Sequence, residues 1–277
     1  MSELLGTWID GVAGNSVPID DRGLQYGDGI FETILVRSGK PRFLEAHLGR
    51  MRRGLVQLGI PFLATEALLG EIGRAAAMAP PLAILKIIVT RGSTKRRGYA
   101  PAGFVQARRI VSLWETTALE RAVLEKGVIL GIARLRLPPQ SAFPGIKHLN
   151  RLENVMAAAE GIDAPSYESL MLDTGDHLVS GTSCNVFIVK SGTLLTPPVD
   201  RVGVAGVMRG IVLRESVSLG IAAREQILTM DDVAGADGIF ITNARIGVVQ
   251  VQRVGEHVFP MNPIATRLAA HIETLDA

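Results

Sequence analysis

One lysine in this chain has a placement that could support covalent chemistry. Lys147 follows the constrained segment PPQSAFPGI, and the apolar spacing of KHLNRLENVMAAAEG predicts a helix that opens at this lysine. The partial positive charge at a helix N-terminus lowers the pKa of an adjacent ammonium group. A neutral amine is the form that adds to a carbonyl to make a Schiff base. The same position also suits an ordinary exposed lysine at a helix start, so both interpretations stay open.

Two segments and one arginine offer donors for an anion. In GVAGVMRGIVL, Gly203 and Gly206 precede a predicted helix, where unpaired backbone N–H groups can hold a negative charge. In ITNARIG, Thr242 and Asn243 end an apolar strand and carry hydroxyl and amide donors. Arg50 can add a charge-assisted, bidentate contact. Each signal is weak alone, because glycines before a helix more often serve plain capping.

The loop TKRRGYAP could bind a substrate carboxylate. It contains Arg97 and Tyr99, and the planar guanidinium of arginine matches a carboxylate. A solvated basic loop explains the same composition equally well. His47, His148 and Asp28 are titratable candidates, but no spacing links them into a catalytic set. The chain has no HExxH, GxSxG, P-loop or dinucleotide-binding pattern.

Composition restricts the class of protein. Of the 277 residues, 47% are hydrophobic and 20% charged with a net charge of +2, so we expect an ordinary globular protein that does not bind nucleic acid. The lone cysteine, Cys184, excludes an intrachain disulfide and a cysteine-rich metal site, and we expect no metal. The start MSELLGTWIDG does not have the pattern of a signal peptide, and the most apolar stretch is broken by Pro80, Pro81 and Lys86. We therefore expect a cytoplasmic protein without a membrane partner.

Helical and strand patterns are mixed without regular alternation, which favours an α/β or α+β class with two subdomains. We expect a smaller N-terminal domain over 1–115 and a larger C-terminal domain over 116–277. Apolar spacing within the helix predicted after Lys147 gives one stripe, formed by Leu149, Leu152, Val155 and Met156. The other predicted helices cover 47–60, 65–78, 204–220 and 262–275.

Seven motifs in a fixed order extend these observations. They are DRGLQYGDGIFET, HLGRM, RGSTKRRGY, GIKHLNRLENVMAA, LVSGTSCNVF, TPPVDRVGVAGVMRG and ITNARIG. Over nearly the whole chain, this series resembles the class IV aminotransferase-like family, the fold-type IV pyridoxal-phosphate enzymes. The resemblance implies a two-domain α/β fold, a homodimer, a small-molecule substrate, and pyridoxal 5'-phosphate bound at the domain interface. It also places the Schiff-base lysine in the larger C-terminal domain.

The same resemblance assigns roles to individual residues. Lys147 matches the lysine that anchors the cofactor and does the catalytic proton transfer, and Ser180 occupies the position that faces the pyridine nitrogen. The positions that match phosphate-binding groups are Arg50, Val207, Met208, Thr242 and Asn243. The positions that match residues lining the substrate site are Tyr26, Glu32, Arg97 and Tyr99.

Within the family, GIKHLNRLE and RGY most resemble the lyases that convert 4-amino-4-deoxychorismate to 4-aminobenzoate and pyruvate in folate biosynthesis. Ser180 departs from the family pattern, which has a glutamate there to keep the pyridine ring protonated. A lyase whose product becomes aromatic needs that electron sink less, so Ser180 favours the lyase. A D-amino-acid or branched-chain aminotransferase is the first alternative, and a non-catalytic cofactor-binding paralogue is the second.

Overall fold

The protein divides into two units, which we describe separately in a computed structural model. The structure describes residues 3–62, 64–94, 98–101, 106–139, 142–161 and 166–275. The first unit comprises Met1–Ala118 and the short segment Ile146–Asn150, and the second comprises Leu119–Gly145 and Arg151–Ala277. This division differs from the expected domains 1–115 and 116–277, because the segment with Lys147 makes its contacts in the first unit.

The first unit is built on a six-stranded sheet in which each paired strand runs antiparallel to its neighbour. The strand order is β2-β1-β6-β5-β3-β4. The strands are β1 (Leu4–Ile9), β2 (Val12–Ala13), β3 (Gly29–Arg37), β4 (Lys40–Pro41), β5 (Leu82–Thr90) and β6 (Arg108–Glu115). Burial along β5 alternates, with Leu85, Ile87 and Val89 fully buried. Because successive side chains of a strand point to opposite faces, this alternation places one face of the sheet against a hydrophobic core.

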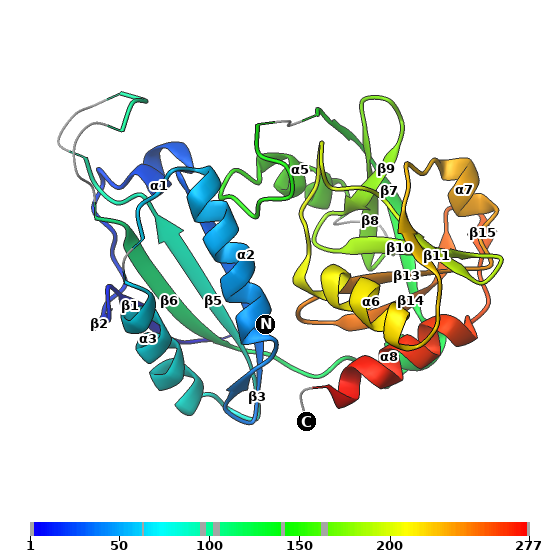
Figure 1. The fold of residues 1–277 in the computed structure, drawn as a ribbon, viewed down its shortest axis with the longest axis horizontal. Helices are drawn as coiled ribbons and strands as arrows, with labels where there is room; N and C mark the ends of the chain where they lie inside the picture. The colour runs from blue at the N-terminus through cyan, green and yellow to red at the C-terminus, as the bar shows by residue number, and fades with distance from the viewer. Residues whose placement is uncertain are drawn as a thin grey trace. The chain divides into compact units, whose positions relative to one another are not determined.

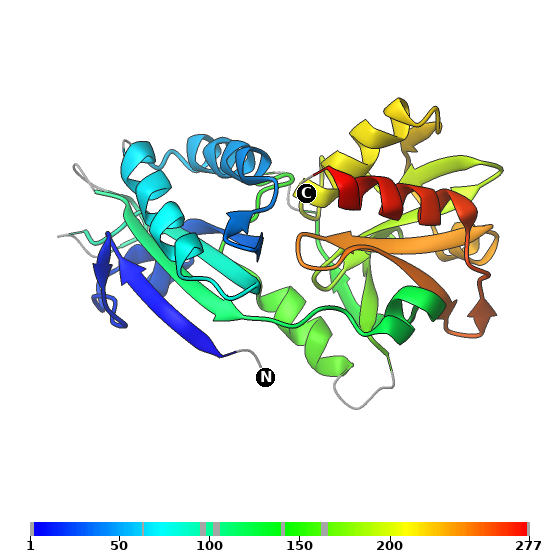
Figure 2. The same ribbon diagram turned by 90° about the horizontal axis from the view of Figure 1, so that it is seen from below.

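Helices α2 (Leu44–Gln57) and α3 (Thr65–Ala77) lie along one face of this sheet (Figures 1 and 2). In α2, Leu48, Met51 and Leu55 recur at spacings of three and four residues and are buried in the core against the sheet. The segment DRGLQYGDG, which has the composition of a loop, instead contains the short helix α1 (Arg22–Tyr26). The Asp21 carboxylate caps this helix by accepting from the Gly23 N–H.

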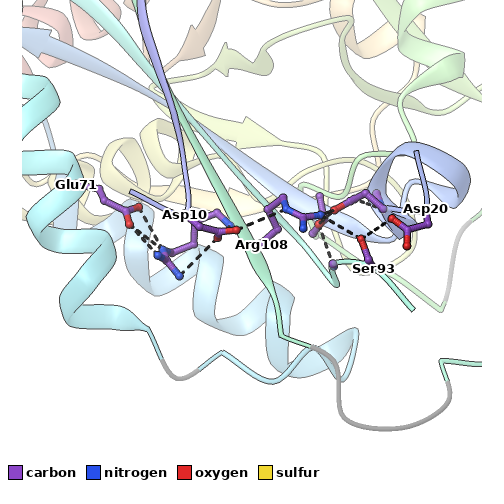
Figure 3. Close-up of polar contacts among 10 residues, drawn as sticks. Asp10, Asp20, Glu71, Ser93 and Arg108 are labelled. Atoms are coloured by element: carbon purple, nitrogen blue, oxygen red, sulfur yellow. Dashed lines mark hydrogen bonds and ion pairs between the residues drawn. The ribbon is translucent and has the colours of Figure 1, made fainter. Parts of the chain in front are cut away.

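Charged residues fasten the edge of this unit. The Arg109 side chain donates to both carboxylate oxygens of Glu71 on α3, at 2.8–3.2 Å, and both residues are buried. Arg108, its neighbour on β6, pairs with Asp21 and lies 3.5 Å from Asp10 (Figure 3). Asp10 lies near both arginines, 3.5 Å from Arg108 and 3.8 Å from Arg109, so the two side chains share one carboxylate and differ in their second partner.

The second unit has a nine-stranded mixed sheet. Its order is β12-β11-β10-β13-β14-β7-β8-β9, with β15 also paired to β14. The strands are β7 (Val128–Leu137), β8 (Glu168–Asp173), β9 (Leu178–Gly181), β10 (Asn185–Lys190), β11 (Thr193–Thr196), β12 (Ala223–Glu225), β13 (Gly238–Asn243), β14 (Gly247–Val254) and β15 (His257–Val258). Its core includes Phe187 of β10 stacked on Phe240 of β13, with ring centroids 4.9 Å apart.

Five helices accompany the second sheet in the described part of the chain. They are α4 (Arg121–Lys126), α5 (Leu152–Glu160), α6 (Val207–Ser218), α7 (Met230–Ala234) and α8 (Pro263–Thr274). Helices α6 and α8 lie side by side against β13 and β14 (Figures 1 and 2). Throughout the residues that the structure describes, every helix is too short or too polar to cross a membrane.

The helix after Lys147 differs from its prediction in two ways. It begins at Leu152, five residues after the lysine, so Lys147 does not open it. The expected apolar stripe is also exposed within this chain, because Leu152, Val155 and Met156 are 69%, 60% and 54% accessible. Helical spacing identifies an apolar face correctly, but it does not identify what covers that face.

Candidate active site

Lys147 lies in an extended segment that adds to the edge of β3. The Phe31 N–H donates to the Lys147 carbonyl at 3.0 Å, and the Leu149 N–H donates to the Gly29 carbonyl at 3.0 Å. The Nζ of Lys147 lies 4.2 Å from the centroid of the Phe31 ring. The effect of a helix dipole falls off within the first turn, so the argument that a helix start lowers the pKa of this amine is wrong. Its surroundings are instead set by β3 and α2.

Strand β3, which pairs with the Lys147 segment, also carries a buried carboxylate. This carboxylate, Glu32, binds two side chains of α2. Glu32 accepts from the Nε and Nη2 atoms of Arg50 at 2.8 and 2.5 Å, and the Nδ1 of His47 lies 2.7 Å from the same carboxylate. His47 and Arg50 are three residues apart and therefore share one face of the helix. All three side chains are almost fully buried.

The protonation states of this cluster follow from its contacts. Burial opposes ionisation of Glu32, but hydrogen bonds from Arg50 and His47 outweigh burial and hold its pKa below the ordinary value. Burial lowers the pKa of His47, and the charges of Arg50 and Lys147 add to that effect against the opposing influence of Glu32. His47 is then neutral at pH 7. Since the carboxylate only accepts, the proton of the neutral imidazole must be on Nδ1.

This geometry changes the role expected for Glu32. The side chain is 2% exposed and both carboxylate oxygens are engaged by α2. Such a group orients Arg50 and balances its charge, and the geometry does not suit direct contact with a substrate. Arg50, the matched phosphate-binding residue, is in turn held by a bidentate pair, which fixes the plane of its guanidinium.

The two tyrosines expected near the substrate lie together. The ring centroids of Tyr26 and Tyr99 are 5.5 Å apart, and the Arg22 guanidinium lies 4.9 Å from the centroid of Tyr26. Tyr99 is 86% exposed. Arg97, the other residue expected to bind a carboxylate, lies outside the described residues.

The second unit holds the remaining predicted residues. Ser180 on β9 is buried, and its hydroxyl donates to the Gly181 carbonyl at 2.8 Å. The turn that follows is fastened by Glu168, which accepts from the backbone N–H and the hydroxyl of both Thr182 and Ser183. With its proton donated to Gly181, the Ser180 oxygen can offer only lone pairs to another group.

The start of α6 has the form of an anion site. Gly206 is the N-cap, and Val207 and Met208 occupy the first helical positions; among the described residues, no side chain caps this end of the helix. A Cβ at Gly206 would lie 2.0 Å from the Oδ1 of Asn185, so a side chain there would collide with Asn185. Uncapped N–H groups at a helix start suit a phosphate, and so does a carboxylate-held arginine such as Arg50. The residues present therefore fit a phosphate-bearing cofactor.

The loop after β13 is more self-contained than expected. Thr242 is fully buried, and its hydroxyl donates to the Gly247 carbonyl at 2.6 Å. The Oδ1 of Asn243 accepts from the N–H groups of Arg245 and Ile246 at 2.9 and 3.0 Å. Both polar side chains thus shape the turn between β13 and β14, and in this conformation the Thr242 proton is used within the loop.

His47 and Asp28, two titratable residues without a predicted role, have defined partners in the structure. The structure joins His47 to Glu32 and Arg50, and the spacing of three residues from Arg50 is a signal that could have found it. Asp28 is joined instead to two other arginines, Arg22 and Arg91. No local spacing reveals that pairing, because Arg91 is far away in the sequence.

Comparisons with known proteins agree with the motifs. The family profile for amino-transferase class IV matches residues 29–254. An aminodeoxychorismate lyase of Vibrio harveyi is 34% identical over 96% of this chain and 99% of its own length. The crystal structure of 4-amino-4-deoxychorismate lyase from Pseudomonas aeruginosa has a TM-score of 0.93 and 40% identity, covering 98% of this chain and all of that one.

One more distant structure bears on the fold and on the cofactor of its own protein. A hypothetical aminotransferase from Mycobacterium tuberculosis, solved in a PLP-bound form, has a TM-score of 0.83 and 20% identity, and 98% of each chain is covered. At that identity the likeness shows a common fold and nothing further.

Proposed function

Because the chain belongs to the class IV aminotransferase family, we propose that it is a pyridoxal-phosphate-dependent lyase that converts 4-amino-4-deoxychorismate to 4-aminobenzoate and pyruvate. The similarity to lyases over nearly the full length, at 34% and 40% identity, supports this choice of reaction. The observation that carries the proposal is the placement of Lys147 on the edge of β3, the strand whose Glu32 binds Arg50 of α2.

Four of the predicted residues would hold the cofactor. Lys147 would join its aldehyde, and Arg50 with the N–H groups of Val207 and Met208 would bind its phosphate. When bound, the cofactor supplies an electron sink for cleavage next to the substrate amine. Glu32 would keep Arg50 oriented through its two hydrogen bonds.

Each remaining task falls to a residue of the chain. The Lys147 amine would accept the proton from the ring carbon that bears nitrogen, and the bond from the ring to the enolpyruvyl oxygen breaks. The ring becomes aromatic and the three-carbon group leaves as pyruvate, with no water or oxidant consumed. The Tyr99 loop would hold a substrate carboxylate together with Arg97.

Ser180 would face the pyridine nitrogen as a neutral partner. Its hydroxyl donates to Gly181 and offers the ring lone pairs without a negative charge. Such a partner supports a protonated ring less well than a carboxylate does. A reaction that gains aromatic stabilisation tolerates that loss better than transamination does, which favours the lyase.

The test is a direct assay with 4-amino-4-deoxychorismate in which 4-aminobenzoate and pyruvate are both measured. We expect equal amounts of the two products, and little conversion of D-alanine with 2-oxoglutarate. Lys147→Ala should lose more than about 10³-fold in rate, the order of effect of removing a covalent catalyst. Turnover of D-alanine in place of the chorismate substrate would reject the lyase, and activity retained by Lys147→Ala would reject the role of the lysine.

We further propose that the protein is a homodimer. The exposed apolar face of α5, formed by Leu152, Val155 and Met156, supports an interface, because soluble proteins seldom leave contiguous apolar surface in water. Light scattering after size-exclusion chromatography should give twice the mass of one chain. A monomer at micromolar concentration would contradict the proposal.

A further inference from the structure

A partly buried carboxylate in the first unit, Asp28, is shared by two arginines. Asp28 Oδ2 accepts from the Nε of Arg22 at 2.8 Å and from the Nε of Arg91 at 2.7 Å, and Asp28 Oδ1 accepts from Arg91 Nη2 at 3.1 Å. Arg22 and Arg91 are 3% and 8% exposed. Burial opposes ionisation of Asp28, but the two arginines overcome it and hold its pKa below the ordinary value. The group is therefore a charged Arg–Asp–Arg triad.

One end of this triad is attached to α2. Arg91 donates from Nη1 to the Gly59 carbonyl and from Nη2 to the Leu58 carbonyl, both at 2.7 Å. These are carbonyls at the C-terminal end of the helix, where a positive charge is favourable. The helix carries Arg50, so the triad is anchored to the element that bears one predicted phosphate-binding residue.

The other end holds the Tyr99 loop. Arg22 donates from Nη1 to the Gly98 carbonyl at 3.0 Å and from Nη2 to the Tyr99 carbonyl at 2.6 Å. Gly98 has a φ of +113°, a backbone conformation that other residues rarely adopt. Two carbonyls held by one rigid guanidinium fix both the position and the direction of the backbone here.

The distribution of burial argues for more than a role in folding. Tyr99 is 86% exposed, so packing of its ring contributes little to the core. The buried guanidinium of Arg22 nevertheless donates two hydrogen bonds to the backbone carbonyls of Gly98 and Tyr99. The effect is to present the ring of an exposed tyrosine from a fixed backbone, which suits a ligand-contacting residue.

We propose that Arg22 is a positioning residue for substrate binding. Arg22 holds the backbone of Gly98 and Tyr99 in place, while Asp28 and Arg91 connect its guanidinium to the end of α2. The inference deepens the proposed function, since it relies on Tyr99 contacting the substrate. Arg22 acts through Gly98 and Tyr99 and does not itself contact the cofactor or the reacting atoms.

The first test separates binding from chemistry. Arg22→Gln should raise KM for 4-amino-4-deoxychorismate about tenfold and leave kcat within about twofold, since only a binding contact is lost. Arg22→Lys, which keeps the charge but can reach fewer acceptors, should recover part of the effect. Arg121→Gln is the control, because this arginine is 89% exposed and pairs with Glu125 in the next helical turn.

A double-mutant cycle tests whether Arg22 acts through Tyr99. If it does, Arg22→Gln combined with Tyr99→Ala should raise KM no more than Tyr99→Ala alone. Independent, multiplicative effects on KM would overturn the proposal. So would a variant Arg22→Gln that melts earlier but keeps its KM, because that result would make Arg22 purely structural.

Amide hydrogen exchange gives a readout that needs no substrate. The peptide containing Gly98 and Tyr99 should exchange about tenfold faster in Arg22→Gln than in Arg121→Gln or the unaltered protein. Unchanged exchange would overturn the inference even if the enzyme is active. Failure of the unaltered protein to turn over the chorismate substrate would instead reject the proposed function, and with it the substrate role of Arg22, whatever the exchange shows.

Discussion

The two units prepare their candidate site residues by different physical means. The first uses paired, ionised side chains, which are buried in Glu32 and Arg50 and partly buried in the pair of Asp28 with Arg22. The second uses backbone N–H groups at the start of α6 and neutral hydroxyls, including Ser180. Paired charges are costly to bury and costly to break, whereas backbone sites depend on space and chain direction. Substitutions should therefore fail differently in the two units.

The largest effect is expected where a charge pair is broken. Glu32→Gln leaves the buried Arg50 without its counter-charge, and breaking a buried pair from one side costs about 3–5 kcal/mol. Urea denaturation should show a loss of that order in the free energy of unfolding, together with weaker binding of pyridoxal phosphate in an absorbance titration. Glu3→Gln, at an exposed position, should change neither. A loss below about 1 kcal/mol for Glu32→Gln would show that the pairing matters less than its geometry indicates.

The corresponding break in the second unit is steric. Gly206→Ala places a Cβ 2.0 Å from the Oδ1 of Asn185, whose amide is held by the Val204 carbonyl at 2.9 Å. We expect a cost of about 1–3 kcal/mol from overpacking, and a weaker affinity for pyridoxal phosphate. Gly210→Ala in the same helix is the matched control, because its Cβ meets nothing within 4 Å and alanine favours a helix. Equal behaviour of the two variants would contradict a space requirement at Gly206.

The stability of the first unit should depend on pH through its buried histidine, His47. The pKa of His47 is lowered in the folded state, so below the unfolded value of 6.5 the unfolded chain binds more protons and stability falls. The free energy of unfolding should decrease between pH 7 and pH 5 by up to about 1.4 kcal/mol per pH unit for this one group. Glu32, whose pKa is also lowered, contributes its own loss only at pH below about 4.5.

His47→Asn tests the source of that pH dependence. The variant should flatten the profile between pH 7 and pH 5, whereas His257→Asn, at an exposed position, should leave it unchanged. Parallel profiles for His47→Asn and the unaltered protein would show that another group is responsible.

The smallest effect is expected at Ser180. Ser180→Ala removes one hydrogen bond to Gly181, worth about 1 kcal/mol, and removes no charge. The rate of 4-aminobenzoate formation should stay within about threefold, since the hydroxyl is a neutral partner. A loss beyond about thirtyfold would mean that this second-unit site depends on a side chain as strongly as the first unit does.

Periodicity predicted many elements from the sequence. The helix expected at 65–78 is α3 (Thr65–Ala77), and the apolar segment VILGIARLRL forms the strand β7 (Val128–Leu137). Both have apolar residues at the spacing of a single element, and glycine or proline marks their ends. The motifs identified the family, which the match over residues 29–254 confirms.

Other features depend on contacts that local patterns do not contain. Lys147 was selected for a helix start that lies five residues further on, because its true setting is a backbone pairing with β3. The stripe on α5 is apolar but exposed. Glu32 was expected to face the substrate, because its partners on α2 are known only once the strand and helix pack.

The short pairing of the Lys147 segment with β3 also affects how the chain folds during synthesis and how it can be truncated. The first unit is interrupted, because its last stretch, Ile146–Asn150, is separated from Ala118 by part of the second unit. During synthesis, β3 must wait for residue 150 to leave the ribosome before its edge at Gly29–Phe31 is paired. A fragment that ends at Ala118 would expose that edge to aggregation and would lack the lysine altogether. The continuous stretch that ends at Ala118 is therefore not the whole first unit, and it cannot be moved to another protein together with Lys147.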